Sequence, residues 1–111
     1  MNDATAGEVS DTLKIDVVVE AGRVVCRLSG ELDSTTGPVL RAVLNEQLDA
    51  SEDTVIDLSA VSFIDSSGVG VLVGALRRFQ ETGGKLSLRA PNASLRRVFE
   101  MTGLSEALPI E

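Results

Sequence analysis

Four consecutive residues in this 111-residue chain have the types and spacing best suited to a chemical role. They are Asp65, Ser66, Ser67 and Gly68. An apolar run precedes them and apolar residues at helical spacing follow, so a carboxylate and two hydroxyl groups stand at the start of a predicted helix. Such side chains commonly accept a hydrogen bond from a first-turn N–H group, which is worth ~1 kcal/mol. From the residues alone, Asp65 or Ser66 is therefore interpreted as a helix cap.

Glycine recurs along the same predicted helix, at Gly68, Gly70 and Gly74. Because an exposed glycine inside a helix costs ~1 kcal/mol relative to alanine, we expect close packing at Gly70 and Gly74. At Gly68 the alternative is that a partner approaches the bare backbone. The spacing is similar to a dinucleotide fingerprint, but the third glycine is one residue late and Arg89 stands where an acidic residue is expected. A phosphate site at Gly68 and the helix N-terminus is disfavoured by Asp65 and the net charge.

Catalytic and metal-binding residues are scarce. The chain has no histidine and a single cysteine, which removes the usual zinc ligands and the common Ser-His and Cys-His pairs. A receiver-domain role for Asp65 would need a neighbouring acidic pair and a lysine, whereas the only lysines, Lys14 and Lys85, lie in predicted strands. We therefore expect no catalytic residue, no metal site, no cofactor and no enzymatic activity.

The net charge limits the classes of partner. A formal charge of −7 and a pI near 4.5, with the ten lysines and arginines scattered, would repel the phosphate backbone of a nucleic acid. The first residues contain neither a basic region nor an apolar run. We expect no direct nucleic-acid binding, no membrane association and a cytoplasmic location.

The chain length fits one domain with a modest core. Residues 1–10 are polar and acidic, which predicts a flexible tail, and residues 11–111 are expected to form a single domain. Apolar residues alternate on both sides of Ala21-Gly22, which predicts an antiparallel hairpin. Cys26 alternates with Val24 and Leu28 in its second strand, so we expect a buried, reduced thiol.

Apolar stripes between cap and stop residues predict three helices, and short apolar or alternating runs between them predict strands. The order β-β-α-β-α-β-α indicates an α/β fold, a small mixed β-sheet with helices mainly on one face. After the hairpin the predicted elements are a helix beginning within Ser34 to Pro38, a strand from Thr54 to Leu58 that Ser59 to Ile64 continue to Asp65, a helix ending at Gly83-Gly84, a strand from Lys85 to Arg89 and a helix from Asn92 to Gly103.

Three segments of the chain are typical of one family. They are Leu28-Ser29-Gly30-Glu31-Leu32-Asp33, the run from Ile56 through Phe63-Ile64-Asp65-Ser66-Ser67-Gly68 to Gly70, and Gly83-Gly84 followed by Phe99-Glu100-Met101-Thr102-Gly103-Leu104. With these segments the chain resembles the anti-sigma-factor antagonists, small proteins built from a STAS domain, the module that they share with sulfate transporters. The resemblance covers nearly the whole chain and implies a STAS-like fold.

The resemblance also implies roles for individual residues. In this family the first serine after the aspartate is phosphorylated by a partner kinase that is also the anti-sigma factor, and that serine corresponds to Ser66. By the same resemblance Asp33 is part of the partner contact, and we expect Asp65, Ser67 and Gly68 to bind the partner beside Ser66. We interpret Asp33 as a recognition residue, the alternative being that it caps the first helix.

The implied function is partner switching. The unphosphorylated chain would bind the anti-sigma factor and free a sigma factor, phosphorylation would dissociate the complex, and a metal-dependent serine phosphatase would reset it. Nucleotide and metal would belong to these partners. The alternative hypothesis is a STAS subunit that docks a transport ATPase and is never phosphorylated, and a homodimer is compatible with either.

Overall fold

The computed structural model describes residues 12–49, 53–89, 91–103, 106 and 110. The order of its elements confirms the predicted β-β-α-β-α-β-α fold, whereas the tail predicted for residues 1–10 lies outside the described residues. The elements are β1 (Leu13–Glu20), β2 (Arg23–Leu32), α1 (Gly37–Asp49), β3 (Thr54–Ile64), α2 (Ser66–Thr82), β4 (Leu86–Arg89) and α3 (Ala93–Thr102).

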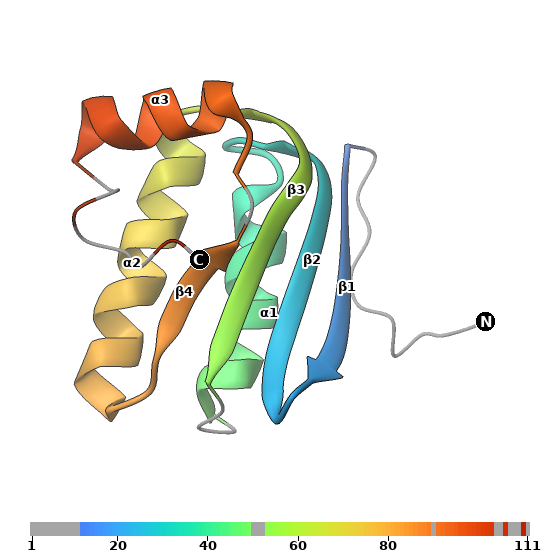
Figure 1. Cartoon of the computed structure of the whole chain (residues 1–111), viewed down its shortest axis with the longest axis vertical. Helices are drawn as coiled ribbons and strands as arrows, with labels where there is room; N and C mark the ends of the chain where they lie inside the picture. Colours follow the sequence, from blue (N-terminus) through green and yellow to red (C-terminus); the bar gives the residue numbers. More distant parts are fainter. Residues whose placement is uncertain (1–11, 50–52, 90, 104–105, 107–109, 111) are drawn as a thin grey trace.

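The four strands form one mixed sheet in the order β1-β2-β3-β4. β1 and β2 are the predicted antiparallel hairpin, and β2, β3 and β4 are parallel to one another. α1 and α2 lie side by side on one face of the sheet, and α3 lies across the end at which β3 finishes (Figure 1). The prediction of helices mainly on one face is therefore confirmed.

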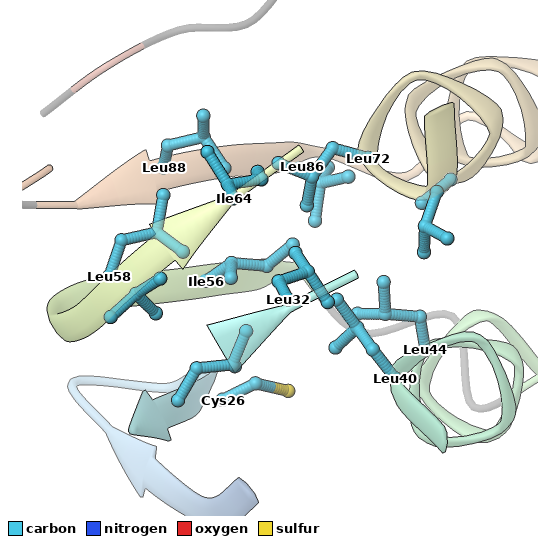
Figure 2. Packing of buried hydrophobic residues seen from close by; sticks show 14 of the residues in the cluster. Cys26, Leu32, Leu40, Leu44, Ile56, Leu58, Ile64, Leu72, Leu86 and Leu88 are labelled. Carbon is cyan, nitrogen blue, oxygen red and sulfur yellow. The ribbon is translucent and has the colours of Figure 1, made fainter. Parts of the chain in front are cut away.

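The core lies between the sheet and the two long helices. Leu40 and Leu44 of α1 and Leu72 of α2 point toward the strands (Figure 2) and are almost fully buried. Cys26 is buried in the same cluster, which confirms its predicted position, and burial raises the pKa of its thiol to about 12. The alternating strand residues and the helix stripes thus meet in one apolar layer.

The helix-free face of the sheet is covered in part by long charged side chains. Val25 and Val55 occupy neighbouring positions on β2 and β3 and are 0% and 1% exposed. Glu20 forms ion pairs with Arg27 at 3.2 Å and with Arg89 at 2.9 Å, and so joins β1 to β2 and to β4 on the opposite edge. The aliphatic parts of such side chains can cover apolar surface while their charged ends stay in water.

β3 continues beyond the predicted apolar run to Ile64, and β2 ends beside it, with Leu32 paired to Ile64. Parallel neighbours are about 4.8 Å apart, so the residues that follow the two strands emerge together at one edge of the sheet. Within the described ranges, no helix is long and apolar enough to cross a membrane.

Candidate functional site

The candidate site is built from two strand ends and one helix start. Asp33 follows β2 directly, and Asp65 follows β3 and opens α2. The N–H group of Asp65 donates to the carbonyl oxygen of Leu32 at 3.3 Å, so the two strands stay together up to this point. Of the five residues predicted for the site, Asp33, Asp65, Ser66 and Ser67 follow these two adjoining strand ends.

Asp65 is the N-cap of α2, which decides between the two capping residues that the sequence allowed. Its Oδ1 accepts the N–H of Gly68 at 3.0 Å. Ser66 and Ser67 occupy the first turn, and both are exposed. Since Asp65 does the capping, the hydroxyl group of Ser66 is not needed to cap the helix.

Gly68 is buried, and its role is packing within the chain. A Cβ atom there would lie 2.6 Å from the carbonyl oxygen of Leu32 and 2.8 Å from a side-chain carbon of Ile64. Only a residue without a side chain lets the first turn of α2 approach the end of β2 this closely. The interpretation of Gly68 as backbone open to a partner is therefore wrong, because β2 and β3 already occupy that space.

Gly70 and Gly74 are the reverse case, and the close packing predicted for them is wrong. Among the residues that the structure describes, a Cβ atom on Gly70 would meet nothing within 4 Å, and one on Gly74 would meet only the guanidinium of Arg78 at 3.7 Å. Ser66 and Gly70 are one turn apart on the same side of α2. The position one turn after Ser66 therefore carries no side chain, although packing does not require a glycine there.

Asp33 has a structural role as well as a place at the site. Its Oδ1 accepts the backbone N–H groups of Thr35 at 2.9 Å and of Thr36 at 3.1 Å. In return the hydroxyl group of Thr36 accepts the N–H of Asp33 at 2.9 Å, and it donates to the carbonyl oxygen of Glu31 at 2.9 Å. These bonds hold the turn before α1, which begins at Gly37, so Asp33 orders this turn and not the first turn of the helix that the alternative assigned to it. Recognition of Asp33 by a partner stays a prediction.

Two residues near the site were missed by sequence reasoning. Thr36 is fully buried and closes the turn before α1, and the spacing Asp33-x-x-Thr36 is the signal that could have indicated a reciprocal pair of this kind. Phe63 is 47% exposed, whereas Phe79 and Phe99 are 2% and 0% exposed. Its position two residues before Asp65 carried no sequence signal of exposure, because the register of β2 and β3 shifts just before it.

The polar groups of the site are hydroxyls and carboxylates. Within the described residues, no group of three or more His, Cys, Asp or Glu side chains is placed to hold a metal ion. The site offers exposed hydroxyl groups, a half-buried carboxylate that caps α2 and a second carboxylate that holds a turn.

Comparison with known proteins identifies the relatives of the chain. The STAS domain family profile matches residues 14–111. The anti-sigma-B factor antagonist of Bacillus subtilis is 34% identical over 98 residues, which cover 88% of this chain and 90% of that protein.

Solved structures give the same result. An anti-sigma factor antagonist from Mycobacterium paratuberculosis has a TM-score of 0.82 at 30% identity, covering 92% of this chain and 87% of that one. The phosphorylated form of the Bacillus cell fate determinant SpoIIAA has a TM-score of 0.68 at 29% identity, covering 88% of this chain and 91% of that one.

Alanine substitutions at Gly68 and Gly70 form a matched pair that tests the geometry of α2. Gly68→Ala should lower the free energy of unfolding by about 1–3 kcal/mol, because its Cβ atom would clash with β2. Gly70→Ala should raise the free energy of unfolding by up to ~1 kcal/mol, because the added methyl group meets open space in a helix. Urea denaturation of both variants checks the signs, and a change of the same sign in both would contradict the described packing.

Proposed function

Because the chain belongs to the STAS-domain family of anti-sigma factor antagonists, we propose that its unphosphorylated form binds an anti-sigma factor that is also a serine kinase, and that phosphorylation of Ser66 ends this binding. The chain is a regulatory binding protein rather than an enzyme, as its relatives are. In the proposed cycle, which takes place in the cytoplasm, a sigma factor is free while the anti-sigma factor is occupied. A metal-dependent serine phosphatase restores the binding form.

The observation that carries the proposal is the exposed Ser66 directly after the Asp65 cap. Its hydroxyl group stands in the first turn of a 17-residue helix, beside the turn that Asp33 holds. A kinase needs this kind of access, since the acceptor oxygen must reach the nucleotide in another protein's active site. The existence of a phosphorylated form of SpoIIAA supports assigning such a modification to a chain of this family.

Phosphorylation at this position should leave the fold in place. A phosphoserine adds about −1.5 to −2 charge near neutral pH. The unpaired first-turn N–H groups and the helix dipole favour this charge, whereas the Asp65 carboxylate opposes it, and each effect is on the order of 1 kcal/mol or less at an exposed site. Because the two effects have opposite signs, they largely cancel.

Binding responds differently to the same charge. A partner that closes over Ser66 must remove water from the phosphate dianion, and an unpaired buried charge costs several kcal/mol. A loss of that size corresponds to a hundredfold or larger decrease in affinity. The switch would therefore act at the interface and leave the stability of the domain nearly unchanged.

We predict that the kinase modifies Ser66 and not its neighbour. Ser66→Ala should bind the anti-sigma factor constitutively and resist the kinase, and Ser66→Asp should bind at least tenfold more weakly than the wild type. Ser67→Ala is the matched control and should still accept phosphate. Phosphopeptide mapping and calorimetric titration with the cognate anti-sigma factor measure the two effects. The proposal would be contradicted by phosphate on Ser67 or by wild-type affinity of Ser66→Asp. Binding of a transport ATPase in place of an anti-sigma factor would also contradict it.

Asp33 requires variants that separate its charge from its hydrogen bonds. Asp33→Asn keeps a side-chain oxygen for the N–H groups of Thr35 and Thr36, whereas Asp33→Ala removes it and should lower the free energy of unfolding by ~1 kcal/mol. If the partner recognises the carboxylate, Asp33→Asn should lose about tenfold or more in affinity while its melting temperature stays near that of the wild type. Wild-type binding by Asp33→Asn, with weak binding by Asp33→Ala alone, would show that Asp33 acts only through the turn.

Phe63 is proposed as the apolar part of the partner contact. Its Cα atom is paired with that of Glu31, and both residues are exposed on the strand face opposite to the buried pair formed by Leu32 and Ile64. An aromatic ring held in water at the edge of a binding site is the kind of group that contributes most to protein interfaces.

Phe63→Ala should weaken binding of the anti-sigma factor by thirtyfold or more, since buried aromatic anchors are typically worth about 2 kcal/mol or more. Val19→Ala on β1 is the control, because Val19 is more exposed, at 77%, and is paired with Val24 near the start of β2, at the end of the sheet away from Ser66. Titration calorimetry compares the two variants. Equal, small losses in both would remove Phe63 from the interface.

A further inference from the structure

A pocket of about 370 Å³ lies at the end of the molecule opposite to Ser66. It is formed where β2, β3 and β4 begin and where α2 ends, at the foot of the view in Figure 1. Ser66 and Gln80 are 14 residues apart on α2, which places them about 20 Å from each other along the helix axis. A molecule in the pocket would therefore not touch Ser66 itself.

The lining of the pocket combines an apolar floor with a charged rim. Leu76 of α2 and Leu86 of β4 are buried and supply the apolar surface. Gln80, Lys85 and Asp53 stand at the rim, and all three are exposed. Within the described part of the chain, these three side chains make no hydrogen bond or ion pair, so their polar groups are available to a ligand.

The charge of the rim favours an anion. Among the lining residues, Arg23 and Lys85 carry cationic groups and Asp53 carries a carboxylate, and the exposed Lys85 ammonium is the cation that the structure leaves to a ligand. An ammonium group and an amide N–H group, from Lys85 and Gln80, can donate to the same anionic group, and charge-assisted hydrogen bonds of this kind are strong. The size of the pocket lies in the range of small-molecule sites, which are mostly apolar with a few polar groups.

We propose that this pocket binds a small organic anion with an apolar body, such as an aromatic carboxylate. The amine of Lys85 and the amide of Gln80 hold the anionic group at the rim, while Leu76 and Leu86 contact the apolar body. The site is independent of the proposed function at Ser66. The pocket lies at the end of α2 and Ser66 lies at its start. The chain would therefore carry a ligand site and a partner site at opposite ends of α2.

The test is a titration of the ¹⁵N-labelled full chain with 2-naphthoate, followed by amide NMR signals. The amides of Gly84, Lys85 and Leu86 should shift in a saturable manner, with a Kd of about 1 mM or tighter for a ligand of this size. The neutral analogue 2-naphthalenemethanol should bind at least tenfold more weakly, because it lacks the charge that Lys85 recognises. Equal binding of the two probes would overturn the proposal. So would the absence of a saturable shift at 2-naphthoate concentrations up to about ten times the expected Kd.

Variants of the rim complete the test. Lys85→Gln should weaken 2-naphthoate binding about tenfold or more, whereas Lys14→Gln, which removes the only other lysine from an exposed position on β1, should leave it unchanged. Gln80→Trp should fill the mouth of the pocket and abolish binding, and its melting temperature verifies that it folds. An equal loss in both lysine variants would indicate unspecific attraction by charge, and unchanged binding by Gln80→Trp would place the ligand elsewhere; either result would overturn the assignment.

Discussion

The first turn of α2 lies directly against the end of β2, and the rest of the site depends on this close approach. At Gly68 a Cβ atom would be 2.6 Å from the carbonyl oxygen of Leu32, so any side chain would push the helix away from the sheet. With glycine in place, Asp65 can cap α2 while its own N–H group remains bonded to Leu32. The helix start is thereby fixed beside the turn that follows β2.

In this arrangement the capping and packing roles belong to residues adjacent to Ser66 and not to Ser66 itself. The Asp65 side chain accepts a first-turn N–H group of α2, and Gly68 packs against the ends of β2 and β3, so Ser66 is needed for neither interaction. Asp33 and Thr36 bond reciprocally on the neighbouring strand end and hold its turn in one shape. Because its neighbours carry the capping and the packing, the Ser66 hydroxyl group can be modified without disturbing the fold, as the proposed switch requires. The bare position at Gly70 carries a cost in helix stability that packing does not explain.

The parallel part of the sheet gives the molecule two chemically different ends. The carboxyl ends of β2 and β3 lead into Asp33 and Asp65, which bring two carboxylates to this end. Open α/β sheets commonly bind their partners at that edge. The amino ends of β2 and β4 contribute Arg23 and Lys85 to a pocket that also contains the Asp53 carboxylate. α2 spans the distance between the two ends, so a single rigid element carries both surfaces.

The sequence by itself determined the elements and the chemical core of the site, because these follow from local patterns. Gly83 stops α2 in a left-handed conformation and Cys26 lies in the core, as spacing and alternation predicted. Only the tertiary structure decided what surrounds Gly70, since the space beside a glycine depends on which helix face meets the sheet. Likewise Phe63 is exposed because the pairing of β2 with β3 shifts register before it, and no local pattern records how two distant strands align. The pocket at Lys85 joins the starts of three strands to the end of a helix, and such an assembly exists only once the chain has folded.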